Sequence, residues 1–288
     1  MHRVLKAWIL LLLLSVLSGC WRSFQSPIQN FDVPPETTGA LQQHLQEIHG
    51  DADNLFSRAR VTVSRKHRPG KYRAVFYSIY LAPDNAMLKV DDARVGEFFR
   101  VIQRGDRVAV SLSQEGEFYV GNIEELENAS EALMGLQPTD VARAVRVGSA
   151  LPEGLASLPD SLPLPGAEGG AWRLGLTSDG KRMEIYTVRR KDGLVRRLEL
   201  VNPNLEPRVR IEYTAYEHFE EAVFPSLFTI HVPEYQLRIE VEMERVRLGR
   251  VRGVSSFPLM PPPESGIEVR PLGKWLEREM HSREANGR

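Results

Sequence analysis

The sequence predicts a mainly β (α+β) fold in which about eleven antiparallel strands form two runs, with helices before and between them. Three observations predict this class. Short runs of alternating apolar and polar residues recur through most of the chain, which is the period of a half-buried strand. Turn residues separate these runs, and the Asp-Gly pairs at 179–180 and 192–193 are strong hairpin signals. Three other segments instead favour helices.

The first part of the chain reads as an export signal followed by a tether. His2, Arg3 and Lys6 precede an apolar run at residues 7–17, and this order is that of a signal peptide. The run is shorter than the roughly 20 apolar residues that span a bilayer. We expect a signal peptide at residues 1–19 and a flexible tether at residues 20–37, which are polar and contain three prolines.

Cys20 is the only cysteine of the chain and closes the tetrapeptide Leu17-Ser18-Gly19-Cys20. This block resembles the lipobox of bacterial lipoproteins. The resemblance implies cleavage before Cys20 and its acylation by chains such as palmitate, and more than one chain gives stable membrane anchoring. Trp21 is not the aspartate that marks inner-membrane retention, so the resemblance implies the outer membrane. The alternatives are an uncleaved anchor and ordinary cleavage that leaves a free thiol.

The first half of the chain predicts one helix and then a meander of strands. Leu41, Leu45 and Ile48 recur at helical spacing within residues 40–48, and Thr38 is a plausible cap. We expect a turn at residues 68–70, Arg-Pro-Gly. The expected strands lie at residues 55–64, 72–81, 87–90, 98–103, 107–112 and 118–120.

The middle and second half predict two more helices and a second run of strands. We expect helices at residues 122–133 and 138–147, and a covering loop over 148–170, which is rich in proline and leucine. Residues 237–244 alternate without fault, so one face of the sheet should be wet. The expected strands lie at residues 172–177, 182–190, 194–201, 209–216, 224–232 and 237–244.

Composition and motifs argue against several functions. With 42% hydrophobic residues and a net charge of -1, the chain has a real core and no charge excess that would suit nucleic acid. The seven histidines are scattered and no nucleotide fingerprint is present. We therefore expect no catalytic residue, no metal and no cofactor. An enzyme would need His218 or His231 to meet two carboxylates in a pocket.

The arginines and lysine around the turn at residues 192–193 leave two interpretations open. Arg189, Arg190, Lys191, Arg196 and Arg197 gather there. Such a tip can contact lipid headgroups or an acidic partner, but it more often keeps a sheet edge soluble.

The order of the parts resembles the LolA/LolB-like fold of lipoprotein-localisation factors. A lipobox, a short helix, a meander, a helical insertion and a second meander follow one another, and the segments 224–227, Phe-Pro-Ser-Leu, and 256–269 are similar to family motifs. The resemblance covers about residues 38–272 and implies an unclosed antiparallel β-barrel whose open side is covered by helices. It also implies an apolar cavity for acyl chains and no covalent chemistry.

Two features depart from the family pattern. Its outer-membrane receptor carries a protruding leucine on a loop of the first meander, and within the corresponding residues 91–96 only Val95 is a candidate. The chain also continues past the resemblance, as a tail at residues 273–288.

The expected function is that of an outer-membrane lipoprotein, monomeric, that binds the acyl chains of a lipid or lipoprotein and takes part in their transfer. The alternative is a structural or assembly lipoprotein with a filled core. Strands whose two faces are both apolar are consistent with an acyl-binding cavity and with a filled core. The candidate lining residues are Phe76, Tyr80, Phe98, Val110, Leu198, Ile211 and Phe228.

Overall fold

The computed structural model describes residues 38–49, 55–65, 68–82, 85–92, 96–128, 134–147, 156–157, 171–178, 182–189, 192–202, 206–220, 222–248 and 259–285. Cys20, the expected signal peptide and tether, and Val95 lie outside these residues. So do the side chains of residues 68–82.

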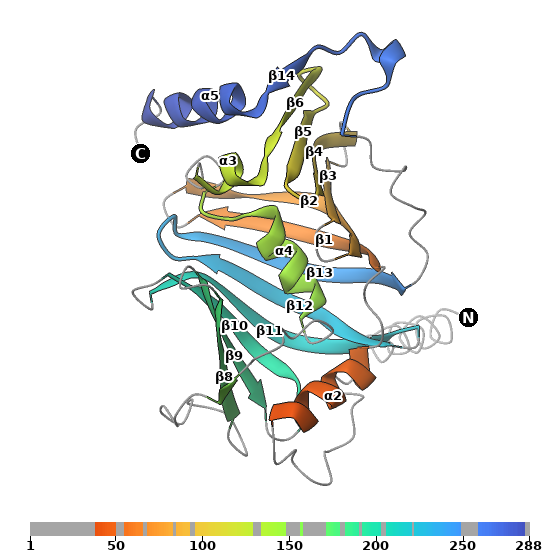
Figure 1. Ribbon diagram of the computed structural model, residues 1–288, viewed down its shortest axis with the longest axis vertical. Coiled ribbons are helices and arrows are strands. Elements are labelled where there is room, and N and C mark those ends of the chain that lie inside the picture. The colour runs from red at the N-terminus through yellow and green to blue at the C-terminus, as the bar shows by residue number, and fades with distance from the viewer. Residues whose placement is uncertain are drawn as a thin grey trace, which may run out of the picture.

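One sheet of fourteen strands dominates the molecule (Figure 1). Its order is β14-β6-β5-β4-β3-β2-β1-β13-β12-β11-β10-β9-β8-β7, and neighbouring strands are antiparallel except for β14 beside β6. The two edge strands do not pair with each other within the described residues, so the sheet is unclosed. The expected mainly β, unclosed fold is confirmed.

The strands follow the chain in two runs. The first run has β1 (Leu55–Arg65), β2 (Arg68–Ala82), β3 (Asn85–Asp92), β4 (Gly96–Arg104), β5 (Arg107–Leu112) and β6 (Glu117–Asn122). The second has β7 (Ala156–Ser157), β8 (Ala171–Ser178), β9 (Arg182–Arg189), β10 (Val195–Val201), β11 (Pro207–Phe219), β12 (Ala222–Val232) and β13 (Leu237–Leu248), and β14 (Val269–Pro271) comes last.

The helices pack on one face of the sheet, which we call the inner face. They are α2 (Thr38–His49), α3 (Ile123–Asn128), α4 (Pro138–Arg146) and α5 (Leu272–Ala285), and a short 3-10 turn, η3, spans Pro263–Ser265. Helix α4 lies across the middle strands, with α2 towards β12 and α5 beside β6 (Figure 1). The helices expected near residues 40–48 and 138–147 are confirmed.

Side chains alternate along the strands, so that apolar residues lie on the inner face of the sheet and charged residues on the outer face. On β1, Ala59 and Val61 are buried on the inner face. Arg60 points the other way and pairs with Glu242 at 3.1 Å and with Glu244 at 2.9 Å. The wet face predicted from residues 237–244 is confirmed, since the outer face of β1 and β13 carries such ion pairs between the two strands.

The structure differs from the expectations drawn from the sequence at three places. The turn expected at residues 68–70 is wrong, because these residues begin β2. The sheet has fourteen strands where about eleven were expected, and the short edge strands β7 and β14 were not predicted. Residues 272–285 form α5, whose Trp275 and Leu276 are buried in the main core.

Candidate ligand-binding cavity

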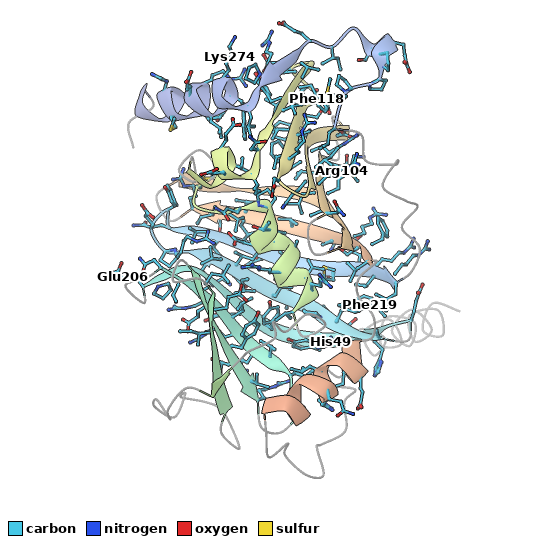
Figure 2. The ribbon with its side chains drawn as sticks, in the orientation of Figure 1. His49, Arg104, Phe118, Glu206, Phe219 and Lys274 are labelled. Carbon is cyan, nitrogen blue, oxygen red and sulfur yellow. The ribbon has the colours of Figure 1, made fainter. Side chains whose placement is uncertain are left out.

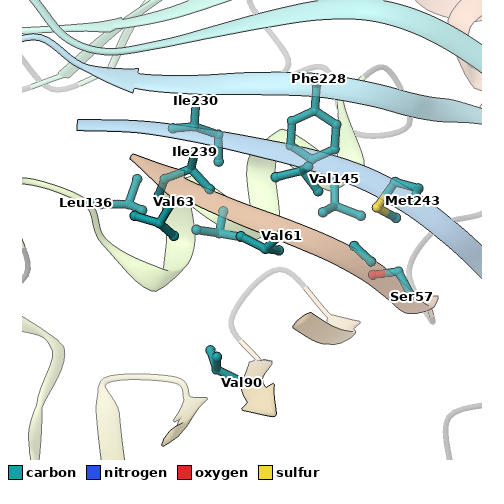
Figure 3. A pocket seen from close by; sticks show the side chains of 13 residues that line it. Ser57, Val61, Val63, Val90, Leu136, Val145, Phe228, Ile230, Ile239 and Met243 are labelled. Atoms are coloured by element: carbon teal, nitrogen blue, oxygen red, sulfur yellow. The ribbon is translucent and has the colours of Figure 1, made fainter. Parts of the chain in front are cut away.

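A cavity of about 190 Å³ lies between the inner face of the middle strands and helix α4 (Figure 3). Strands β1, β3, β12 and β13 form its floor, and α4 with the preceding residue Leu136 forms its roof. The only polar side chain among the described lining residues is Ser57. The described lining residues are Ser57, Ala59, Val61, Val63, Val90, Leu136, Val141, Val145, Phe228, Ile230, Ile239, Val241 and Met243.

Burial differs between the two ends of the cavity. Ser57, Phe228 and Met243 lie at one end and are buried. Val63 and Ile239 lie near Leu136 at the other end, and all three are only half-buried (Figure 3). We call the half-buried end at Val63, Leu136 and Ile239 the mouth of the cavity; Val90 of β3, which lines the cavity apart from this end, is half-buried as well.

A buried ion pair holds the roof in place. The guanidinium of Arg208 on β11 donates two hydrogen bonds to the Asp140 carboxylate, each 2.8 Å, and a third of 2.7 Å to the Gly135 carbonyl. Asp140 is fully buried and also accepts from the Gln137 backbone N–H at 2.9 Å. These bonds satisfy the carboxylate, as a buried charge requires, and they fix the start of α4 over the sheet.

Two further polar contacts fix the rest of α4. Arg143 pairs with Glu184 of β9 at 2.5 Å, and the same carboxylate accepts the Tyr186 hydroxyl at 2.7 Å. Burial, together with this carboxylate, raises the pKa of Tyr186 well above its usual value. The Tyr213 hydroxyl donates to the Ala144 carbonyl at 3.1 Å. Helix α4 is thus fastened to β9 and β11 while its apolar face lines the cavity.

Helix α2 ends on a buried histidine. His49, at the end of α2 (Figure 2), is fully buried beside β12. Its Nδ1 donates to the Val223 carbonyl, and its ring contacts Tyr216 and Phe224. Among the described residues its Nε2 has no hydrogen-bond partner. Burial lowers the pKa of His49 to about 4, because the charged imidazolium loses its hydration.

Among the described residues, those predicted to line the cavity lie in three different environments: the cavity, the main core and the exposed surface. Phe228 lines the cavity. Val110, Leu198 and Ile211 are fully buried in the main core, outside the described lining set. Phe98 is 48% exposed on β4 and does not belong to that set.

The side chains of Phe76 and Tyr80 lie outside the described residues, and only their register is known. Position 76 pairs with Ala59 and Val90, both of which line the cavity. Position 80 pairs with Leu55 and Ala86.

Sequence reasoning missed most of the lining because it favoured aromatic residues. The β-branched residues Val61, Ile239 and Val241 form much of the floor. Their signal was the alternation at 57–63 and 239–243, which places every second residue on one face. The contribution of α4 could be found in its spacing of Val141 and Val145, four residues apart on one helical face.

The described residues contain no group of three or more histidine, aspartate and glutamate side chains placed to hold a metal ion. Within the same residues, no helix combines the length and apolar character needed to cross a membrane.

No family model and no curated protein matches the sequence. Solved structures do match. A DUF1329 family protein from Desulfovibrio piger aligns with a TM-score of 0.56 at 13% identity, over 79% of this chain and 96% of that one. A LolA superfamily protein from Nitrosomonas europaea aligns with a TM-score of 0.53 at 8% identity, over 77% and 97%.

A third solved structure is similar to the same extent. It is a putative outer membrane lipoprotein-sorting protein domain from Vibrio parahaemolyticus, with a TM-score of 0.51 at 9% identity over 75% of this chain and 93% of that one. At such identities the likeness concerns the fold. With the unclosed antiparallel sheet and the helices over its inner face, these matches show that the protein has the LolA/LolB-like fold.

Proposed function

We propose that the protein binds a single acyl chain of a lipid or lipoprotein in the cavity under α4 and takes part in its transfer at the outer membrane. The observation that carries the proposal is the apolar cavity between the sheet and a fastened helix. Each methylene that leaves water for such a site contributes about 0.8 kcal/mol.

The size of the cavity limits its occupant. Its volume of about 190 Å³ resembles that of apolar cavities of about 150 Å³ that take up benzene. It is below the roughly 300 to 1,000 Å³ of pockets for drug-sized ligands. One end of a single chain fits this space, whereas the several chains of a triacylated anchor do not.

The proposed location rests on the sequence around Cys20. Its resemblance to a lipobox supports acylation and anchoring, and Trp21 at the following position supports the outer membrane. The Vibrio parahaemolyticus protein of the same fold is described as lipoprotein-sorting. That description supports a role in moving lipid or lipoprotein.

A change at the mouth tests the proposal. We would titrate the purified Cys20→Ala chain, which lacks an acyl anchor of its own, with the fluorescent fatty acid cis-parinaric acid. Val63→Phe places a larger ring where the half-buried Val63 lines the mouth. We expect it to weaken binding at least about tenfold, which is roughly 1.4 kcal/mol, because the ring occupies the entrance.

Val120→Phe is the matched control. Val120 is also a half-buried strand valine, but it packs with Phe118 and Ile102 in a small cluster separate from the main core. We expect this variant to bind the probe like the parent. If the parent does not take up the probe, or if both variants lose it equally, acyl binding in the cavity is wrong and the structural role of a filled-core lipoprotein is favoured.

A further inference from the structure

Arg65 continues the row of β1 residues that line the cavity. Ser57, Ala59, Val61 and Val63 all face the cavity from alternate positions of β1, and Arg65 is the next member of that series. From Ala59 to Arg65 the pairing of β1 with β13 runs without a shift, so Val63 lies opposite Ile239 and Arg65 opposite Leu237.

The partner position shows which face Arg65 occupies. Directly paired residues of antiparallel strands share a face, and Leu237 is buried in the main core on the inner face. Arg65 is half-buried. The residue therefore lies on the inner face, one alternation beyond the valine at the mouth.

Among the residues that the structure describes, Arg65 has no carboxylate partner, in contrast to the arginines on the other face of the same strand. Arg58 pairs with Glu244 at 3.2 Å, and Arg60 pairs with Glu242 and Glu244. Arg65 forms no ion pair with any carboxylate among the described residues. A half-buried guanidinium beside an apolar mouth favours a carboxylate or phosphate, to which it can donate paired hydrogen bonds.

The other positive feature of this mouth is already satisfied. The N-terminus of α4 follows Leu136, and helix N-termini attract anions. Here Asp140 and Gln137 form a capping box, and the Asp140 carboxylate is also bound by Arg208. The helix end therefore has its own anion, whereas the described residues offer Arg65 no ion-pair partner, and a ligand can supply one.

We propose that Arg65 binds the anionic head of a single-chain amphiphile, a fatty acid or a lysophospholipid, whose chain segment next to the head lies in the cavity. This inference rests on the proposed acyl binding and specifies the class of ligand. The small cavity selects one chain, and the arginine at its mouth selects a carboxylate or phosphate head.

The test compares a charged probe with its neutral form. The purified Cys20→Ala chain is titrated with cis-parinaric acid and with its methyl ester, which keeps the chain and removes the charge. We expect the acid to bind about tenfold more tightly than the ester, as a charge-assisted bond at a half-buried site allows. Added salt should weaken binding of the acid and leave binding of the ester unchanged.

Variants then assign the preference to Arg65. Arg65→Gln should bring the affinity for the acid down to that for the ester, whose own affinity stays within about twofold. Arg65→Lys should restore part of the difference. The control Arg60→Gln removes a cation from the outer face of the same strand and should leave the ratio of the two affinities unchanged.

The outcomes separate this inference from the function on which it rests. Equal binding of acid and ester by the parent, or an Arg65→Gln variant that weakens both alike, overturns the head-group site while acyl binding stands. Failure of both probes to bind overturns acyl binding itself. Displacement of the probe by palmitate but not by lysophosphatidic acid identifies a carboxylate as the head, and the reverse result identifies a phosphate.

Discussion

At the scale of single residues, His49 makes the stability of the fold depend on pH. Its pKa is about 4 in the folded chain and about 6.5 when exposed. The unfolded chain therefore binds the additional proton between these values, and stability falls as the pH drops from 6.5 to 4. We expect the free energy of unfolding to be about 2 to 3 kcal/mol lower at pH 4.5 than at pH 7 from this residue alone.

Urea unfolding at the two pH values measures this contribution. His49→Asn removes the titrating ring but keeps an N–H donor at the place of Nδ1, so it should flatten the dependence. His281→Asn is the control, because His281 is exposed on α5 and also bonds a carbonyl through Nδ1, that of Glu277 at 2.7 Å. An unchanged slope in the His49 variant would contradict a buried neutral histidine.

Two adjacent phenylalanines show what sequence can and cannot say about the site. Phe98 and Phe99 are equally apolar, and on a strand only one of them can face the core. Phe99 contacts the Trp275 ring with centroids 6.2 Å apart, whereas Phe98 is largely exposed. Composition predicted that an apolar residue of β4 faces inward, but register decides which one, and register depends on partners distant in the chain.

At the scale of elements, the position of α4 depends on the pair between Asp140 and Arg208. Asp140→Asn leaves the Arg208 guanidinium, whose side chain is 26% exposed, without its counter-charge. We expect a loss of about 2 to 4 kcal/mol in the free energy of unfolding, since breaking one side of a buried pair leaves an uncompensated charge. Binding of cis-parinaric acid should weaken as well, because the roof of the cavity is loosened.

An exposed pair provides the comparison. Glu242→Gln removes one of the two carboxylates that pair with Arg60 on the outer face, and the Arg60 and Glu242 side chains are both more than half exposed. Such pairs contribute about 0 to 1 kcal/mol, so denaturation and probe binding should remain close to the parent. Equal losses in both variants would mean that the Asp140 pair does not hold α4.

Elements with a local signal were predicted and those with a distant partner were not. Pro138 and the helical spacing of the apolar residues after it predicted α4. β14 is a three-residue strand that pairs in parallel with β6, about 150 positions earlier, from Val269 opposite Phe118 to Pro271 opposite Val120. Nothing near β14 in the sequence indicates such a pairing. Helix α5 is rich in charge and was expected as a tail, but Trp275 and Leu276 pack on the sheet.

At the scale of the whole molecule, helices pack on two regions of the inner face, one on each side of the cavity under α4. Trp275 of α5 packs on Phe99 and Tyr119 towards one end, and α2 packs Leu45 and His49 near β12 towards the other. Between these two packed regions, the described residues leave a cavity under α4. In the proposed function this cavity takes one acyl chain, and an anchor at Cys20 would hold it close to a membrane.

An acyl anchor at Cys20 would determine where the whole chain resides. Acylation at Cys20 would anchor the chain at a membrane, since more than one buried chain gives stable binding. We expect Cys20→Ala to move the protein from the membrane pellet to the soluble periplasmic fraction and to leave binding of cis-parinaric acid unchanged. The rival explanation is adhesion through the exposed apolar side chains Phe98 and Met260. A Phe98→Ala, Met260→Ala double variant with Cys20 intact should therefore stay in the pellet. If the double variant is released to the soluble fraction while the Cys20→Ala variant stays in the pellet, the protein attaches to the membrane through its domain surface.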